Sequence, residues 1–341
     1  MISAIRPVKP DMGEPSAVLV RTPNWLGDLM MSTAFLRALL ARFPQARVDL
    51  IVRRGFETLP LPHRGRIHAF DKRAMASGAF GRQFKNGGHS HMFVLPPSLS
   101  SAWMAYRTGI PWRIGHPGQL RTFLLRPALP HRNPPRSIHL AQEYLELLEP
   151  WMRATVEAYP PGLEIDATWI ARHLPAALAG AEDYAVLAPG AEFGPAKQWP
   201  PAHYREVART LGREGVRVVV AGLPAEREAA AGILADVPGG LNLCGDTALP
   251  NLTAMLARAR LLVSNDSGAM HVAAALAIPQ VAIFGSTNPD WTAPLNPKAA
   301  ILYRGEPCSP CYGRTCHLGH TRCLTEISPE EVLAAARPLL G

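Results

Sequence analysis

The sequence has no long apolar run, and this absence limits where the protein can act. Its 341 residues contain no stretch of about 18 consecutive apolar residues, the length that a membrane-spanning helix needs. The first segment, MISAIRPVKPDMGEP, has no apolar core followed by small residues at a cleavage site, so we do not expect secretion. We expect a cytoplasmic protein whose residues 1–15 form a polar tail before the first strand.

Charged residues are scarce at 18% of the chain, whereas hydrophobic residues make up 48%, which is typical of a globular protein rather than a disordered one. A chain of this length exceeds one ordinary core, so we expect two domains. The segment AYPPGLEIDAT at 158–168 is rich in residues that break regular structure, and we interpret it as the linker. We predict domains over 1–165 and 166–325, and a C-terminal helix over 326–341.

Acidic residues are nearly absent from the middle of the first half. Between Arg53 and Arg136 the chain has 14 Lys and Arg but only Glu57 and Asp71. The formal net charge of +8 therefore arises in the first half of the chain, since the second half has a small negative balance. We expect the first half to meet an anionic partner. Charge alone leaves open nucleic acid, a phosphorylated glycolipid, an anionic membrane surface, or a basic background without function.

Short apolar strands alternate with amphipathic helices along most of the chain, which predicts parallel sheets with helices on both faces. The predicted strands cover 17–21, 48–52, 67–70, 92–95, 112–115, 184–188, 216–221, 241–244, 261–264 and 280–284. The predicted helices cover 29–43, 138–151, 201–213, 224–236, 250–259, 267–277 and 329–340. Two α/β domains of this doubly wound kind leave a cleft between the carboxyl ends of their sheets, where ligands bind.

The loop after the first strand lacks the glycines of a dinucleotide-binding loop. The pattern G-x-G-x-x-G needs several, and PNWLGD at 23–28 contains only Gly27. Its Asp28 would repel a phosphate at the start of the helix, but a carboxylate facing the cleft suits a general base that accepts a hydroxyl proton. The alternative is that Asp28 simply caps the helix.

The segment SNDSGAMH at 264–271 joins a predicted strand to a predicted helix. Ser267 and Gly268 leave the helix N-terminus open, so its backbone amides can hold an anion. His271 lies one turn further on the same face and could donate to that anion or to a sugar hydroxyl. Asp266 could bind a ribose or sugar hydroxyl. The alternatives are a helix cap for Asp266 and a buried core histidine for His271.

Two further loops end at the same edge of the second sheet. The segment PGAEFGPAKQWP at 189–200 contains Gly190 and Gly194, which permit a close backbone approach. Its Lys197 offers a mobile positive charge suited to a diphosphate, the alternative being a solvated loop lysine. The segment GSTNPDW at 285–291 follows the last predicted strand.

Cysteine is rare as well, with five residues, of which four lie within a short segment near the C-terminus: Cys308, Cys311, Cys316 and Cys323. Without an export signal, such a group favours free thiolates or a metal over disulfides. The spacing is compatible with a structural four-cysteine zinc site or an iron–sulfur cluster, but it matches no standard zinc finger. Free or packed thiols remain the alternative, and Cys244 is expected in the core.

Four segments together resemble the ADP-heptose:lipopolysaccharide heptosyltransferases, a family of inverting, metal-independent glycosyltransferases with the GT-B fold. They are, in chain order, VRTPNWLGDLMMSTAFLRAL, PGAEFGPAKQWP, SNDSGAMHVAAAL and VAIFGSTNPDWTAPL. The first and last of them are similar to the type II enzymes. The resemblance implies two Rossmann-like domains that face a central cleft, the first binding the acceptor and the second binding the nucleotide sugar.

The resemblance also implies an activity and roles for particular residues. The protein would transfer a heptose from ADP-L-glycero-D-manno-heptose to the inner core of lipopolysaccharide, a heptose or Kdo–lipid A, with no cofactor for catalysis. Asp28 would be the general base that deprotonates the acceptor hydroxyl, and Lys197 would neutralise the donor diphosphate. The residues that would hold the phosphates, the heptose and the ribose are Asp266, Ser267, Gly268, His271, Thr287 and Glu226.

The basic first half acquires a meaning from the resemblance, because the acceptor carries phosphates at the cytoplasmic face of the inner membrane. We expect peripheral contact with that anionic surface, and acceptor contacts from among Arg53, Arg54, Arg113 and Arg121. The four cysteines near the C-terminus lie outside the motifs that carry the resemblance, so we expect a structural role for them.

Two alternatives stay open at the level of sequence. One is another GT-B nucleotide-sugar enzyme, either a different glycosyltransferase or an epimerase, since fold alone does not separate them. The other is a nucleic-acid-binding protein with a four-cysteine metal module. The latter is disfavoured because the cysteines lie in the half with a negative balance, without interleaved basic and aromatic residues. We therefore expect no nucleic-acid partner.

Overall fold

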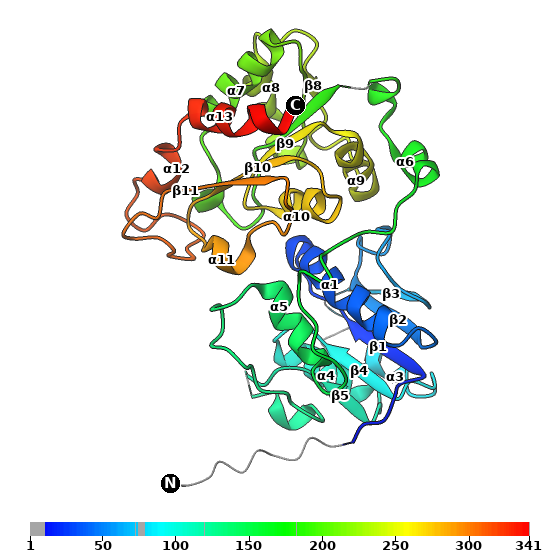
Figure 1. Cartoon of the computed structure of the whole chain (residues 1–341). Coiled ribbons are helices and arrows are strands. Elements are labelled where there is room, and N and C mark those ends of the chain that lie inside the picture. The colour runs from blue at the N-terminus through cyan, green and yellow to red at the C-terminus, as the bar shows by residue number, and fades with distance from the viewer. Residues whose placement is uncertain (1–10, 72, 74–78, 119, 182, 341) are drawn as a thin grey trace.

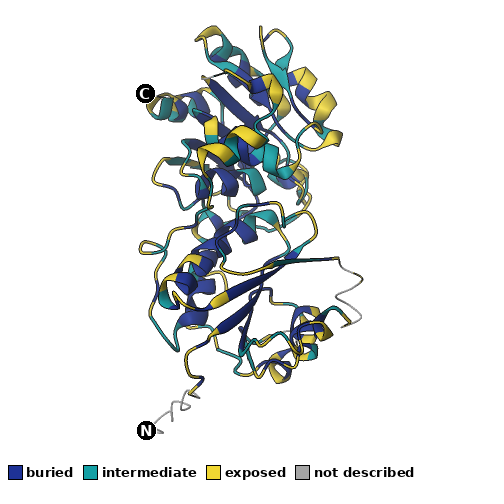
Figure 2. Ribbon diagram, turned by 90° about the vertical axis from the view of Figure 1, so that its right-hand side faces the viewer, coloured by how far each residue is buried: buried dark blue, intermediate teal, exposed yellow. Residues whose placement is uncertain are grey.

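The computed structural model describes residues 11–71, 73, 79–118, 120–181 and 183–340, which form two lobes (Figure 1). The first half of the chain forms the lower lobe, and the second half, with the C-terminal helix, forms the upper one. Figure 2 shows that the strands and the helix surfaces against them are buried, whereas exposed residues lie on the outer helices and loops. The polar tail predicted for 1–15 falls mostly outside the described residues, because these begin at residue 11.

The lower lobe contains one sheet in which every neighbouring pair of strands is parallel. Its strands are β1 (Ala17–Arg21), β2 (Arg47–Arg53), β3 (Ile67–Phe70), β4 (His91–Val94) and β5 (Trp112–Ile114). Their order across the sheet is β3-β2-β1-β4-β5, so the winding direction reverses between β1 and β4. In doubly wound sheets of this kind the ligand crevice lies outside the carboxyl ends of the strands at that reversal.

The upper lobe repeats this topology with one more strand, again with only parallel pairs. Its strands are β6 (Tyr184–Ala188), β7 (Arg217–Val220), β8 (Leu241–Asn242), β9 (Leu261–Asn265), β10 (Gln280–Phe284) and β11 (Ala299–Tyr303). Their order is β11-β10-β9-β6-β7-β8, with the reversal between β6 and β9. The segments singled out at 189–200 and 264–271 therefore follow the two strands that flank the reversal.

Helices cover both sheets. In the lower lobe they are α1 (Leu26–Arg42), α3 (Ala79–Arg82), α4 (Leu99–Arg107) and α5 (Leu140–Leu145), with the single turns η1 (Thr122–Leu124) and η2 (Glu146–Leu148). In the upper lobe they are α6 (Ala167–His173), α7 (Pro201–Arg213), α8 (Arg227–Leu234), α9 (Leu249–Arg258), α10 (Gly268–Ala275), α11 (Pro289–Thr292), α12 (Arg322–Thr325) and α13 (Pro329–Leu340). The upper lobe also has the single turns η3 (Ala176–Leu178), η4 (Pro195–Lys197) and η5 (Pro224–Glu226).

Helices α1 and α10 join the two lobes, and glycine makes their close packing possible. A Cβ atom on Gly27 would lie 2.7 Å from Cδ2 of His271, and one on Gly268 would lie 2.8 Å from Cδ2 of Leu26. Both distances are shorter than carbon atoms tolerate, so a larger residue at either glycine would force the His271 ring or the Leu26 side chain to move. This contact places the segment 23–28 of the lower lobe against the segment 264–271 of the upper one.

The sequence predicted the doubly wound two-lobe fold correctly. The strands predicted at 17–21, 67–70, 184–188 and 280–284 and the helices predicted at 201–213 and 329–340 match the structure. The last helix begins with a capping box, in which Ser328 Oγ accepts from the Glu331 N–H at 3.3 Å and Glu331 Oε2 accepts from the Ser328 N–H at 2.9 Å. Such caps are readable from sequence because both partners lie within one turn.

Several elements differ from the prediction: the helix predicted over 224–236 is the turn η5 followed by α8, the strand predicted over 241–244 ends at Asn242, and α4 and α6 had no predicted counterpart. The helix predicted over 138–151 begins at Leu140, because the His139 side chain caps it by accepting from Ala141 N–H at 3.1 Å, and it gives way to the turn η2 after Leu145. Strand β11 was missed. It lies at the edge of the upper sheet, where its apolar run AAILY is only half-buried, and a short apolar run alone does not distinguish a strand from a helix.

Candidate functional site

A cleft of about 580 Å³ lies between the lobes at the carboxyl ends of both sheets. The structure brings together there every residue that the sequence had suggested for catalysis or donor binding: Asp28, Lys197, Glu226, Asp266, Ser267, Gly268, His271 and Thr287. Asp28 comes from the lower lobe and the other seven come from the upper one. The cleft can thus place an acceptor and a donor on opposite walls.

Asp28 lies in the first turn of α1, but it is not the helix cap. The cap position is Trp25, whose side chain makes no capping hydrogen bond. Burial in the cleft raises the pKa of Asp28 to about 6, while the positive charge of Lys197 lowers it and the negative charge of Asp266 raises it. A carboxylate with such a pKa is ionised at pH 7 and is a better proton acceptor than an ordinary aspartate.

Lys197 forms the centre of a charged group opposite Asp28. Its ammonium group pairs with Oδ2 of Asp266, and the same oxygen accepts a hydrogen bond from the Thr287 hydroxyl at 2.6 Å. The ammonium also lies 5.0 Å from the centre of the Phe193 ring. Asp266 is therefore occupied as a partner of Lys197 and Thr287, and the cap of α10 is Ser267. A bound diphosphate would compete with Asp266 for this positive charge.

His271 is buried in the wall of the cleft, against Gly27 of the opposite lobe. The pKa of His271 is lowered to about 4, mainly because the ring is buried. The negative charge of Asp266 acts against this shift, whereas the positive charges of His139 and Lys197 add to it. The ring is consequently neutral at pH 7. It can donate one hydrogen bond to a phosphate or a sugar hydroxyl, but it does not supply a positive charge.

The N-terminus of α10 is open toward the cleft. Ser267 caps it without a side-chain hydrogen bond to the helix, and its buried Oγ has no hydrogen-bond partner. This hydroxyl is therefore free to donate a hydrogen bond into the cleft. Free backbone amides at a helix start, combined with the helix dipole, favour an anion such as a phosphate.

Glu226 lies at the donor side of the cleft, between the loops that follow β6 and β7. A Cβ atom on Gly190 would lie 1.8 Å from Oε1 of Glu226, so only glycine leaves room for this carboxylate. Oε2 accepts a hydrogen bond from Leu223 N–H at 2.7 Å. Burial raises the pKa of Glu226, and the bond from Leu223 lowers it. Its oxygens can accept hydrogen bonds from a pair of sugar hydroxyls.

Sequence reasoning missed a contact that closes the cleft from the lower lobe. The Arg136 guanidinium lies 4.8 Å from the centre of the Trp291 ring and 4.5 Å from that of Tyr312, both in the upper lobe. Oε1 of the buried Glu143 accepts from the Arg136 N–H at 3.1 Å and from Trp291 Nε1–H at 3.2 Å. Arg136, Trp291 and Tyr312 all line the cleft. No local pattern could predict this cluster, because its members lie far apart in the sequence.

The arginines that we expected to contact an acceptor do not line the cleft, as far as the described residues define it. Arg121 is buried and donates from Nε to the His116 carbonyl at 2.8 Å. Arg113 donates from Nε to the Leu124 carbonyl at 2.9 Å. Both are used to hold loops of the lower lobe together, and the expectation for Arg53 and Arg54 has no support from the cleft geometry either.

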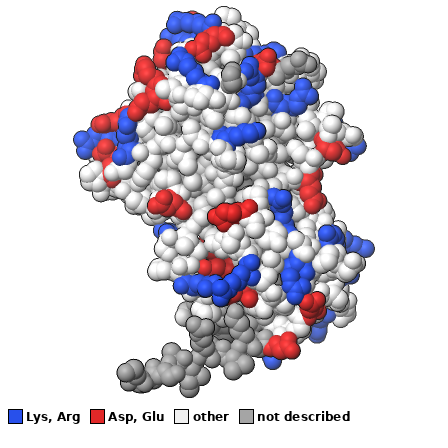
Figure 3. Space-filling view, viewed as in Figure 1, with Lys and Arg blue, Asp and Glu red and all other residues white. Residues whose placement is uncertain are grey.

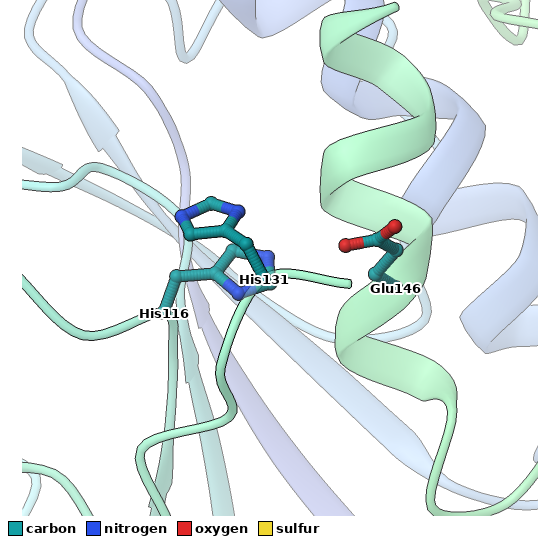
Figure 4. Close-up of side chains that lie close together, drawn as sticks. All are labelled: His116, His131 and Glu146. Atoms are coloured by element: carbon teal, nitrogen blue, oxygen red, sulfur yellow. The ribbon is translucent and has the colours of Figure 1, made fainter. Parts of the chain in front are cut away.

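One group of side chains in the described residues has its ligand atoms close enough to hold a metal ion: His116, His131 and Glu146 (Figure 4). However, the two nitrogens of His116 lie 2.8 Å and 2.9 Å from the carbonyl oxygens of Leu129 and Glu143. The rings of His116 and His131 are also stacked, with centres 3.8 Å apart, and stacked rings do not direct two lone pairs at one ion. This group ties the loop after β5 to α5 and is not a metal site.

The four cysteines near the C-terminus are not gathered as tightly as a formed metal site requires. Among the described residues, no three of their sulfur atoms lie within 4.8 Å of one another. Burial first, and then the charges of Cys308, Cys311 and Cys316, raise the pKa of Cys323 to about 11. The four thiols are therefore electrostatic neighbours without forming a metal cage.

Comparisons with known proteins show which proteins this chain is similar to. The family model for glycosyltransferase family 9 (heptosyltransferase) matches residues 77–322. Lipopolysaccharide heptosyltransferase 2 of Escherichia coli strain K12 is 31% identical, over 95% of this chain and 98% of that protein. The protein of the same name from Salmonella typhimurium is 32% identical over the same shares of the two chains.

Solved structures of related proteins are similar to this chain as well. The structure of the E. coli ADP-heptose lps heptosyltransferase II is 31% identical with a TM-score of 0.80, covering 95% of this chain and 98% of that one. A glycosyl transferase family 9 structure from Veillonella parvula has a TM-score of 0.83 at 22% identity, covering 95% and 97% of the two chains, and it supports the fold alone.

Proposed function

The chain belongs to glycosyltransferase family 9, and on this basis we propose that it transfers a heptose from ADP-L-glycero-D-manno-heptose to the inner core of lipopolysaccharide. It is an enzyme with the GT-B fold, whose two Rossmann-like domains face the cleft described above. The observation that carries the proposal is the placement of Asp28, with its raised pKa, opposite the charged group of Lys197 and Asp266 and the open start of α10.

In the proposed reaction, the Asp28 carboxylate accepts the proton of an acceptor hydroxyl, and the hydroxyl oxygen attacks the anomeric carbon of the heptose. The bond from that carbon to the diphosphate oxygen breaks, and ADP leaves with the bonding electron pair. The Lys197 ammonium and the amides of Ser267 and Gly268 stabilise the charge on the departing diphosphate. A single displacement of this kind inverts the configuration at the anomeric carbon.

The two walls of the cleft have different tasks in this proposal. Residues 1–165 form the acceptor domain, residues 166–325 form the donor domain, and residues 326–341 add a C-terminal helix to the latter. Asp266, Thr287 and His271 position the phosphates and the heptose, and the Glu226 carboxylate accepts hydrogen bonds from the ribose. The support for this division is that Asp28 is the one member of the predicted set that comes from the lower lobe.

The experiment that tests the function is acceptor-dependent release of ADP from ADP-heptose, with formation of an acceptor enlarged by one heptose. Release of ADP only in the presence of a heptose- or Kdo-containing core acceptor supports the transferase. An epimerised sugar nucleotide without transfer would instead favour an epimerase on the same fold.

Recognition of the acceptor is expected to depend on Arg136, since the guanidinium faces the cleft and its N–H groups can bind a phosphate or carboxylate. Arg136→Ala should raise the KM for the acceptor about tenfold, because a charge-assisted hydrogen bond contributes roughly 1.5–3 kcal/mol. The KM for ADP-heptose should stay unchanged. Arg132→Ala is the matched control, because Arg132 lies on the same loop, pairs with Glu149 and does not line the cleft.

The salt dependence of the two KM values tests the charge interaction with the acceptor independently of mutation. The Debye length falls from about 10 Å at 0.1 M to about 3 Å at 1 M, so the acceptor KM should rise with salt more than the donor KM. Equal sensitivity of both constants, or equal effects of the two arginine variants, would contradict the assignment of the lower lobe to the acceptor.

We further propose a structural metal site, either zinc or an iron–sulfur cluster, at Cys308, Cys311, Cys316 and Cys323. Hydrogen bonds from backbone N–H groups, that of Thr321 first, lower the pKa of Cys316 and favour the thiolate that binds metals. The sulfur atoms would have to move closer together on binding. No step of the proposed transfer reaction involves this metal site.

Elemental analysis of the full-length protein, purified without chelators, should therefore find about one zinc per chain, or iron together with acid-labile sulfide. Cys311→Ser should abolish this content and lower the melting temperature, whereas Cys244→Ala should retain the metal, because Cys244 lies in the core of the upper lobe. A metal content equal in the wild type and in Cys311→Ser would rule out the site.

We propose that the enzyme works in the cytoplasm at the face of the inner membrane, where its lipid-linked acceptor would be available. None of the described helices is both long enough and apolar enough to cross a bilayer. Any membrane contact would therefore have to involve the surface of the protein. On the face shown in Figure 3, basic and acidic side chains of the lower lobe are mixed, so this face is not uniformly positive.

A further inference from the structure

Large hydrophobic side chains are exposed in one short part of the lower lobe. Of the nine such exposed residues in the described chain, five lie between residues 99 and 123: Leu99, Trp103, Tyr106, Leu120 and Phe123. Leu120 is 83% exposed and Phe123 is 76% exposed, which is unusually high for residues of this size. Single exposed apolar residues need no explanation, but a group of large ones marks an interaction surface.

These residues form one surface, which we refer to as the α4–η1 patch. Leu99, Trp103 and Tyr106 are spaced four and three residues apart, so they share one face of α4. The Trp103 and Tyr106 rings are stacked with their centres 5.8 Å apart.

The opposite face of α4 fixes the patch to the domain. It buries Ala102 and Met104 in the same apolar cluster as Leu124 and Leu125, which follow Phe123. Helix α4 and turn η1 are therefore neighbours, and their outer sides are both apolar.

The backbone conformation at Leu120 is unusual, and the next residue anchors the chain to the domain. Leu120 has a φ of 57°, a left-handed conformation that non-glycine residues rarely adopt. The next residue, Arg121, is buried, and its guanidinium binds the carbonyl oxygens of His116 and Pro96. Arg121 thus anchors the chain to the loop that precedes α4, directly beside the exposed Leu120.

Positive charges accompany the exposed rings. The Arg107 guanidinium lies 5.6 Å from the centre of the Trp103 ring, and that of Arg113 lies 5.6 Å from the centre of the Tyr106 ring. Arg107 and Arg113 are half-buried, whereas Arg126 is exposed, and its guanidinium lies 5.5 Å from the centre of the half-buried Trp112 ring. The sequence contains no Asp or Glu from residue 72 to residue 142, so no carboxylate of this segment opposes these arginines.

We propose that the α4–η1 patch docks the enzyme on an anionic lipid bilayer. Leu120 and Phe123 would enter the boundary of the acyl chains, Trp103 and Tyr106 would lie at the level of the headgroups, and Arg107 and Arg126 would bind lipid phosphates. A protein partner would need acidic groups to match the arginines and an apolar groove to receive Leu120 and Phe123. A membrane surface supplies both at once.

The patch also lies on a suitable side of the domain. The segments that carry it follow β4 and β5, and the loop with Asp28 follows β1, so all three leave the parallel sheet at its carboxyl edge. Docking there would bring that edge toward the membrane that anchors the acceptor. This reason for a membrane rests on the proposed function, but the binding itself can be measured without any transfer.

The experiment measures co-sedimentation of the full-length protein with vesicles of phosphatidylglycerol and cardiolipin, and with vesicles of phosphatidylcholine alone. The wild type should bind the anionic vesicles, and bind less in high salt. The double variant Leu120→Ser, Phe123→Ser should bind at least about tenfold more weakly, since each side chain loses its apolar burial. The matched control is Ile301→Ser, because Ile301 is 42% exposed on the upper lobe, away from the patch.

A second readout places Trp103 in the interface. Lipids brominated in their acyl chains should quench the fluorescence of the wild type more than that of Trp103→Phe. Transfer to a short, water-soluble acceptor should be the same in the wild type and in both serine variants, which shows that the variants fold.

Equal binding of the patch variant and the control, or equal binding to neutral and anionic vesicles, would overturn the proposal. If gel filtration shows a dimer in the wild type that the patch variant loses, the patch is instead a contact between two copies. A protein that binds vesicles but transfers no heptose would refute the proposed function and leave the docking surface intact.

Discussion

Asp28→Asn is expected to reduce heptose transfer by about 10²–10⁴-fold, the range that a general base contributes. The amide has nearly the same shape as the carboxylate but cannot accept the proton of the acceptor hydroxyl. Folding and ADP binding should change little, because Asp28 does not cap α1 and the donor residues lie on the other lobe. The measurements are the initial rate of transfer, the melting temperature and the dissociation constant for ADP.

The pH dependence gives this prediction a second test. Because burial raises the pKa of Asp28 to about 6, the group is protonated and inactive below that pH and ionised above it. The value of kcat/KM should therefore rise with pH and level off above about pH 7, and this rise should be absent from the residual activity of Asp28→Asn.

A suitable control is Glu330→Gln, which removes a first-turn carboxylate from α13, far from the cleft. It should leave both the rate and the pH profile unchanged. A loss below about tenfold in Asp28→Asn would contradict the role of base.

Lys197→Ala is expected to weaken donor binding or slow transfer by about tenfold to a hundredfold, the equivalent of one charge-assisted hydrogen bond of roughly 1.5–3 kcal/mol. The loss should also free the Asp266 carboxylate next to the diphosphate, which adds repulsion to the lost attraction. Kinetics with varied ADP-heptose at saturating acceptor separate the effect on KM from that on kcat.

Lys298→Ala is the matched control, since Lys298 is an exposed lysine of the same lobe that does not line the cleft. Transfer by the wild type should persist in EDTA, because Lys197 and the start of α10 supply the stabilising charge. Strict dependence on added Mg²⁺ or Mn²⁺ would contradict this assignment.

Much of the site could be predicted from sequence because its motifs lie where a buried strand is followed by a helix. Asp28 follows β1, Lys197 follows β6, and Asp266 with His271 follows β9. Carboxyl ends of parallel strands share an edge, so a correct prediction of the strands already gathers these loops. The predicted roles of these residues rest on the resemblance to the heptosyltransferases.

Other features depend on tertiary contacts that a local pattern does not contain. Arg136 reaches the cleft only because the lobes bring Trp291 and Tyr312 to it. We predicted from its charge that Arg121 would contact the acceptor. In the structure its side chain is buried and donates hydrogen bonds to backbone carbonyls. The contact of Gly27 with His271 could not be predicted either, since it joins two residues from different domains.

The measurement that tests the central claim most directly is the structure of the reaction product. The enzyme is incubated with ADP-heptose of known anomeric configuration and a defined inner-core acceptor, and the new linkage is determined by NMR. Direct displacement by a hydroxyl that Asp28 deprotonates predicts one added heptose with the inverted anomeric configuration. A product with retained configuration, or no product with any heptose- or Kdo-containing acceptor, would contradict the account.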